Sequence, residues 1–166
     1  MSVKTLVSLI LCIFIPVSAV FSQAEEGSSV NFWISPAAET AMYDVADLAF
    51  GGGFALGIGS GVSLGLRTAY FIVPGGISTI ELNFLLRFFL FGADAVSGPF
   101  LQAAAGPAIF TGSGDDVTVP SELGMISAGL SFGWRFLFLN RWFVEPAIRG
   151  GYPYLAGAGV SAGVRF

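Results

Sequence analysis

The sequence predicts an all-β protein, an eight-stranded antiparallel up-and-down transmembrane β-barrel, and three observations support this. The 166-residue chain is 54% hydrophobic and only 11% charged, with a mean hydropathy of +0.79, which is too apolar for an ordinary soluble domain. It also contains 23 glycines, which is unusual for a helical core. Finally, apolar residues alternate with small or polar residues along most segments, as they do in strands whose two faces meet different surroundings. The length suggests a single domain.

The N-terminal segment is expected to be a cleaved signal peptide, so we divide the chain into a signal peptide (1–24) and a barrel (25–166). Lys4 supplies the positive start, 6–17 is apolar, and Ser22-Gln23-Ala24 fits a cleavage site, with 17–19 as a second option. The alternative is a membrane anchor, but the apolar stretch is shorter than the ~20 residues of a spanning helix. The only cysteine, Cys12, lies in this segment, and the residue before it is too large for a lipoprotein signal.

The first half of the barrel is expected to hold four strands. We place them at Val30–Ser35, Phe50–Gly59, Val62–Val73 and Ile77–Phe91. A polar stretch from Pro36 to Asp47 separates the first pair, while Gly59-Ser60-Gly61 and Pro74-Gly75-Gly76 are turn sequences. The first strand is short for crossing a bilayer, since a tilted strand needs about 9–11 residues.

The second half is expected to hold the other four strands. We place them at Pro99–Thr111, Leu123–Leu137, Trp142–Gly151 and Leu155–Phe166. The polar loop 112–122, a tight turn at 139–141 and Tyr152-Pro153-Tyr154 separate them. Two alternatives stay open: a four-helix membrane bundle, which would put arginines at membrane depth and glycines within helices, and a soluble lipocalin-like barrel.

Charged residues within the predicted strands fall on the face away from lipid. These are Arg67, Glu81, Arg87, Arg135, Glu145, Arg149 and Arg165. The connections place Arg67 near Glu81 and Arg135 near Glu145 on adjacent strands, so both pairs are predicted to be ion pairs inside the barrel. The simplest interpretation is structural, because eight-stranded barrels are filled by side chains or hold one small ligand. A polar ligand or an ion path is the functional alternative.

The C-terminal strand carries the most specific resemblance. In Gly159-Val160-Ser161-Ala162-Gly163-Val164-Arg165-Phe166 the apolar residues lie on one face and the chain ends on an aromatic residue. Together with the signal peptide and eight segments, this ending resembles the small bacterial outer-membrane barrels that include the OmpA-, OmpX- and OmpW-like proteins. The resemblance implies a cell outer-membrane location, contact with the lipid bilayer and the assembly machinery, and a role for Phe166 as an assembly signal.

An even number of strands places both termini on one side, which after signal cleavage is the periplasmic side. Interfacial aromatic residues are then expected at the two membrane boundaries. Trp134, Phe136 and Trp142 fall near the periplasmic ends of strands, and Tyr70 and Phe110 near the outer rim.

Two functions are compatible with this architecture. Many inward residues are Gly or Ala, and Pro107 and Pro146 interrupt strands, which favours an OmpW-like conduit or binding site for a small apolar or amphipathic solute. The alternative is a structural or surface-contact protein with a plugged interior and no transport.

Other functions have little support. The chain has no histidine, so we expect no enzyme, no catalytic residues and no cofactor. We expect no metal site, the weak exception being cation binding by Asp115 and Asp116 in a surface loop. The net charge of −4 without a basic patch excludes nucleic acid as a partner. The sequence does not predict an oligomeric state.

Overall fold

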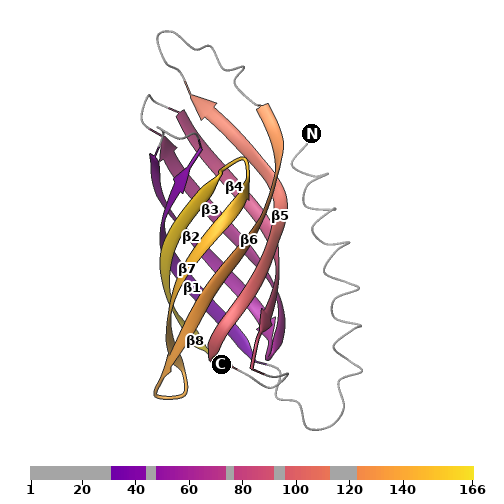
Figure 1. The fold of residues 1–166 in the computed structure, drawn as a ribbon, viewed down its shortest axis with the longest axis vertical. Helices are drawn as coiled ribbons and strands as arrows, with labels where there is room; N and C mark the ends of the chain where they lie inside the picture. Colours follow the sequence, from indigo (N-terminus) through magenta and orange to yellow (C-terminus); the bar gives the residue numbers. More distant parts are fainter. Residues whose placement is uncertain (1–30, 44–47, 74–76, 92–95, 113–122) are drawn as a thin grey trace.

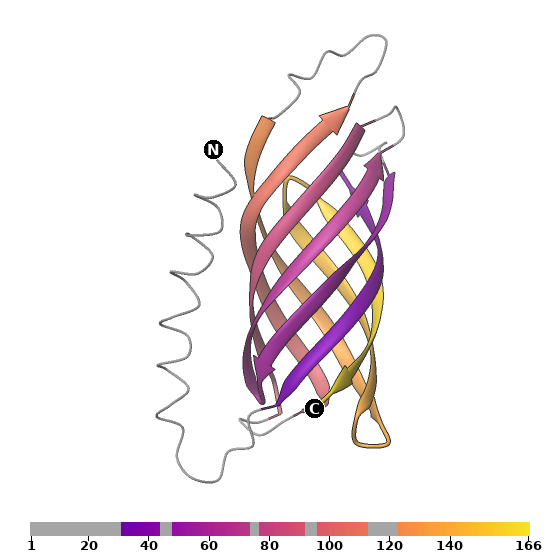
Figure 2. The same cartoon turned by 180° about the vertical axis from the view of Figure 1, so that it is seen from behind.

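A computed structural model describes residues 31–43, 48–73, 77–91, 96–112 and 123–166, which form a closed eight-stranded barrel (Figure 1). Each strand pairs antiparallel with its neighbour in sequence, and β1 pairs with β8 to close the barrel (Figure 2). The predicted fold class is therefore confirmed. The strands are β1 (Phe32–Met42), β2 (Leu48–Gly59), β3 (Val62–Val73), β4 (Ile77–Phe89), β5 (Gly98–Gly112), β6 (Leu123–Phe138), β7 (Trp142–Tyr152) and β8 (Ala156–Arg165).

The barrel has two unlike ends, which we name the terminal end and the rim end. The terminal end carries the start of β1, the C-terminus and the β6–β7 turn. The rim end carries the ends of β1 and β5, the start of β6 and the β7–β8 connection. β5 and β6 are the longest strands, with 15 and 16 residues, and Figure 1 shows them rising well beyond the β7–β8 connection. The rim is therefore slanted.

The alternation of side chains sorts residues into a buried interior and an apolar outer surface. In β4 the inward Glu81 and Asn83 are 0% and 1% exposed, while the outward Ile80 and Phe88 are each 43% exposed. Each strand has at least one large apolar residue on the outer surface, and Ile126 and Leu130 on β6 are the most exposed of these. This is the inverse of a soluble barrel, in which the interior is apolar and the outer surface polar.

The predicted tight turn between β6 and β7 is confirmed. The N–H of Arg141 donates to the carbonyl of Phe138 at 3.1 Å, and Leu139 and Asn140 between them have φ angles of 51° and 58°. Positive φ at both central residues is what a type I′ hairpin turn requires. No helix among the described residues is long and apolar enough to span a membrane.

Three prolines lie in the middle of strands, away from the strand ends, and each interrupts pairing on one side only. Pro36 pairs with Phe54 on β2, but no pair is formed at 35 and 36 with β8. Pro107 and Pro146 similarly pair with β6 and β8, while the β4–β5 and β6–β7 ladders each skip two pairs beside them. The cause is the missing N–H of proline, which in an antiparallel ladder would bond one neighbour only.

Several predicted boundaries are wrong, most of all in β1. The polar stretch predicted from Pro36 is not a loop, because β1 continues through it to Met42. β2 begins two residues earlier than predicted and β4 ends at Phe89 rather than Phe91. A strand can continue through a proline where the neighbouring strand needs no N–H from it. Pro36 was therefore wrongly interpreted as the start of a loop. The predicted signal peptide (1–24) and the loop with Asp115 and Asp116 lie outside the described residues.

Candidate functional site in the barrel interior

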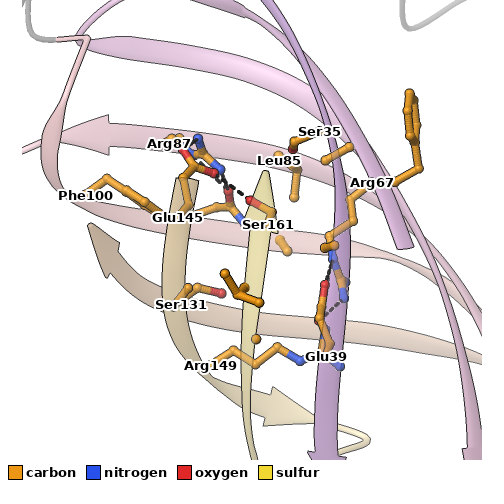
Figure 3. Close-up of a pocket in the computed structure, with 18 of the residues that line it drawn as sticks. Ser35, Glu39, Arg67, Leu85, Arg87, Phe100, Ser131, Glu145, Arg149 and Ser161 are labelled. Atoms are coloured by element: carbon orange, nitrogen blue, oxygen red, sulfur yellow. Dashed lines mark hydrogen bonds and ion pairs between the residues drawn. The ribbon is translucent and has the colours of Figure 1, made fainter. Parts of the chain in front are cut away.

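The barrel interior contains two groups of charged side chains that come from different strands. The four-residue cluster, nearer the rim end, consists of Glu39, Arg67, Glu81 and Arg149. The three-residue cluster, nearer the terminal end, consists of Arg87, Arg135 and Glu145. Figure 3 shows the Arg67–Glu39 and the Arg87–Glu145 contacts as separate groups. Six of the seven charged residues predicted to line the interior belong to these clusters.

In the four-residue cluster, two arginines share two carboxylates. Arg67 Nη1 lies 3.1 Å from Glu81 Oε2. Arg67 also donates to both carboxylate oxygens of Glu39, from Nε to Oε1 at 3.1 Å and from Nη2 to Oε2. Arg149 Nη1 lies 3.3 Å from Glu39 and 3.4 Å from Glu81. The predicted Arg67–Glu81 pair is present, and the cluster links β1, β3, β4 and β7 across the interior with no net charge.

In the three-residue cluster, one carboxylate serves two arginines. Arg87 Nη1 lies 2.7 Å from Glu145 Oε1, and Arg135 Nε donates to the same oxygen, so the predicted Arg135–Glu145 pair is also present. Ser161 Oγ donates to Glu145 Oε2 at 3.2 Å. Arg87 additionally donates to Gln102 Oε1 through Nε and Nη2, at 3.0 and 2.8 Å. This cluster keeps a net charge of +1.

Glu39 is the functional residue that the sequence reasoning missed. The prediction ended the first strand at Ser35, so Glu39 was assigned to a loop. The alternation of Trp33, Ser35, Ala37, Glu39 and Ala41 on one face was the available signal. Such alternation predicts that Glu39 points inward beside Arg67.

Aromatic side chains inside the barrel pack against the arginines of both clusters. At the terminal end, the Arg87 guanidinium lies 4.3 Å from the Phe100 ring centroid, and that of Arg135 lies 4.0 Å from the Phe143 ring. At the rim end, the Arg149 guanidinium lies 3.7 Å from the ring of Tyr154. These distances are typical of cation–π contacts, which help to compensate buried guanidinium groups.

Tyr43, just beyond the end of β1, extends the aromatic layer at the rim end. Its ring makes edge contacts with Phe71, Phe110 and Tyr154, with centroids 6.1 to 6.5 Å apart. Burial raises the pKa of Tyr43 to about 12, so this aromatic layer carries no phenolate charge at physiological pH.

A small cavity lined by both charged and apolar residues lies between the two clusters. Its volume is about 70 Å³, and Arg67, Arg87, Arg149, Glu39 and Glu145 supply its charged lining. Ser35, Gln102, Ser131 and Ser161 also line it. A space of this size holds a few water molecules or one small ion, and it is much smaller than the roughly 300–1,000 Å³ of a site for an organic ligand.

Comparison with known proteins identifies the fold. No protein-family model matches the chain, and no curated protein matches it in sequence. Among solved structures, Neisserial surface protein A (NspA) is similar with a TM-score of 0.59 at 14% identity, covering 84% of this chain and 98% of that chain. The N-terminal β-barrel domain of Pseudomonas aeruginosa OprF has a TM-score of 0.55 at 17% identity, covering 82% and 97%. This chain has the fold of the small outer-membrane β-barrels.

Four of the five aromatic residues predicted for an interfacial girdle lie on the outer surface near the ends of the barrel. The rings of Trp134 and Phe136 stack outside the terminal end with centroids 6.1 Å apart, and Trp142 is 59% exposed there. Tyr70 is exposed toward the rim end, where its hydroxyl bonds Ser78 Oγ at 3.0 Å.

Phe110 departs from the prediction of an outer girdle. It shares the parity of the buried Gln102 and Ala108, and its ring lies against Tyr43 on the inside. The prediction rested on the position of Phe110 near the strand end and ignored the face on which it lies.

The two remaining predicted residues lie at the terminal end. Arg165 is separate from both clusters, because it is the last residue of β8, and its Nη2 donates to the carbonyl of Asn140 at 3.0 Å. Phe166 exchanges two backbone hydrogen bonds with Phe32 at the closing seam, and the two rings lie 6.1 Å apart.

Proposed function

We propose that this chain is an outer-membrane protein whose barrel is closed to solutes, with a structural or surface-contact role and no catalytic activity. The supporting observation is the sequence of layers inside the barrel: aromatic rings, the three-residue cluster, a cavity of about 70 Å³, the four-residue cluster and a second aromatic layer. The ion pairs cross the interior at two levels and so narrow any path for water. The lack of any histidine in the chain further removes the usual general base for hydrolytic chemistry.

The lipid bilayer and the outer-membrane assembly machinery are the partners that this proposal requires. The outward apolar residues provide the lipid-facing surface, and the β1–β8 seam with Phe166 is the element that assembly must close. Function then depends on the surfaces outside the bilayer, above all on the connections at the slanted rim end.

A conduit for small apolar solutes is the second candidate, and one observation favours it. The β4–β5 and β6–β7 ladders skip pairs beside Pro107 and Pro146, which are the places where the wall would part most readily. The cavity, at about 70 Å³ and with five charged residues in its lining, is much smaller than the roughly 300–1,000 Å³ of a site for an organic solute. The closed barrel is therefore the better-supported function.

Planar-bilayer recording of the refolded protein tests the proposal. We expect no long-lived, porin-scale conductance, with a general porin reconstituted in parallel as the positive control. Steady conductance from the purified barrel would refute a closed interior. Uptake of an apolar dye by proteoliposomes, without ion conductance, would instead support the conduit.

A further inference from the structure

The charges inside the barrel do not cancel. Four arginines, at 67, 87, 135 and 149, face three glutamates, at 39, 81 and 145, in the part of the chain that the structure describes. Arginine stays protonated in proteins, so the excess positive charge cannot be removed by titration. A buried charge without compensation is costly in surroundings of low dielectric constant. The interior is therefore short of one negative charge.

The buried guanidinium groups also have donors to spare. Arg149 Nε and Nη2 and Arg135 Nη2 are buried without a hydrogen-bond partner among the described residues. The side chain of Arg149 is only 7% exposed, and it lines the cavity. Glu81 Oε1 and three hydroxyl oxygens, of Tyr43, Ser63 and Thr79, are buried without a partner as well, but none of these residues lines the cavity. Unsatisfied donors thus outnumber unsatisfied acceptors where the open space lies.

The cavity has the charge and size of a site for one small anion. Its charged lining consists of three guanidinium groups and two carboxylates, which leaves a net charge of +1. Ser35, Ser131 and Ser161 bring hydroxyl groups to the lining (Figure 3). Gln102 adds a side-chain amide. The volume of about 70 Å³ accepts a halide with a water molecule and rejects a sugar acid or a larger organic anion.

We propose that a chloride-sized monovalent inorganic anion binds in this cavity, facing Arg67, Arg87 and Arg149. The anion supplies the missing negative charge and an acceptor for the spare donors of Arg149. It is held from both clusters, so it acts as the electrostatic connection between them.

Bromide provides a direct test, because it substitutes for chloride and scatters anomalously. Crystals of the wild-type protein grown in sodium bromide are expected to show an anomalous peak inside the barrel, between Arg87 and Arg149. Bromide peaks confined to the outer surface or the loops would overturn the proposal. This experiment uses the wild-type chain, so it does not depend on whether a variant folds.

A second test compares unfolding temperatures in sodium chloride and in sodium gluconate at equal ionic strength, since gluconate is too large for the cavity. The wild type is expected to unfold at a higher temperature in chloride. Arg149→Gln removes one guanidinium and should abolish this difference, whereas Glu39→Gln raises the net charge of the lining to +2 and should enlarge it.

Arg165→Gln is the matched control, because Arg165 lies at the terminal end and does not line the cavity. It should retain the full wild-type difference between the two salts. An identical difference in all four proteins would show a general effect of the salts and would overturn the proposal.

Discussion

Glu145 is the residue on which the charge pairing at the terminal end of the barrel depends. It is 3% exposed and is the only carboxylate that contacts Arg87 or Arg135 among the described residues. The arginines in turn are 4% and 2% exposed, so both are shielded from bulk solvent. Breaking a buried ion pair by removing one partner leaves an uncompensated charge, which costs more than the pair itself contributes.

We predict that Glu145→Gln lowers the free energy of unfolding by about 3–5 kcal/mol, the usual cost of leaving a buried charge unpaired. Urea unfolding of the refolded barrel, followed by tryptophan fluorescence, measures this change. Glu39→Gln is the matched comparison, and we expect a smaller loss because Glu81 still accepts from both Arg67 and Arg149. An equal loss of unfolding free energy in the two variants would contradict the difference between the clusters, in which one has two carboxylates for two arginines and the other has only one.

Glycines inside the barrel make room for the large interior side chains. A Cβ added at Gly57 would overlap the buried indole ring of Trp33 and lie 2.9 Å from the carbonyl oxygen of Leu64. At Gly150, on the outward face of β7, the nearest atom would be the carbonyl oxygen of Leu155 at 3.4 Å, an ordinary contact.

We therefore predict that Gly57→Ala lowers the free energy of unfolding by about 1–3 kcal/mol, the range typical of an overpacked core. Gly150→Ala should leave it within about 0.5 kcal/mol, as expected for a surface substitution without a clash. The same urea titration measures both variants. A Gly57→Ala protein as stable as the wild type would mean that Trp33 does not fill the terminal end as described.

Among the elements, most strands could be predicted from the sequence and β1 could not. β4 and β6 alternate over twelve or more residues, so their faces and the Arg67–Glu81 and Arg135–Glu145 pairs follow from parity and connection alone. β1 contains Pro36, which can stay in a strand only where no backbone N–H is needed at that position. In the closed barrel this holds, because Pro36 pairs with β2 and not with β8, but the sequence alone does not show it. Contacts across the interior, such as Arg87–Glu145, join strands that are not adjacent and depend on the register of the whole barrel.

The closing seam between β1 and β8 is the element most sensitive to the end of the chain. Phe166 N donates to Phe32 O at 2.8 Å and Phe32 N donates to Phe166 O at 3.2 Å, so the last residue closes the ladder through its backbone. Its ring adds a contact with Phe32 on the outer surface.

Deleting Phe166 should reduce the fraction of protein that reaches the folded, heat-modifiable form in a Gram-negative host. Phe166→Ala keeps the backbone pair and removes the ring, so it separates the two contributions. Electrophoretic mobility of unheated and heated membrane fractions measures the assembled fraction. If neither change alters assembly, Phe166 is not an assembly signal; if only the deletion does, the backbone pair is what matters.

At the scale of the whole molecule, the distribution of polarity is the reverse of that in a soluble protein. Large apolar side chains face outward from nearly every strand, while the ion pairs lie inside. If the barrel is closed to solutes, as we propose, contacts with other molecules are left to the two ends outside the bilayer. The slanted rim, where β5 and β6 rise beyond the β7–β8 connection, is then the part of the molecule most exposed to partners.

The orientation of the barrel in the membrane determines which molecules the rim end can contact. We predict that the rim end faces the cell exterior and that both termini lie in the periplasm. The reason is that the start of β1 and the end of β8 lie together at the terminal end, joined through Phe32 and Phe166, and export delivers the chain from the periplasmic side.

An epitope inserted in the β5–β6 connection (113–122) should be labelled by antibody on intact cells. The same epitope in the β6–β7 turn (139–141) should be labelled only after the outer membrane is permeabilised. The two insertions lie at opposite ends of β6, so each controls for the effect of the other on expression and assembly. Labelling of the 139–141 epitope on intact cells, with the 113–122 epitope protected, would reverse the orientation and move any surface-contact role from the rim to the terminal end.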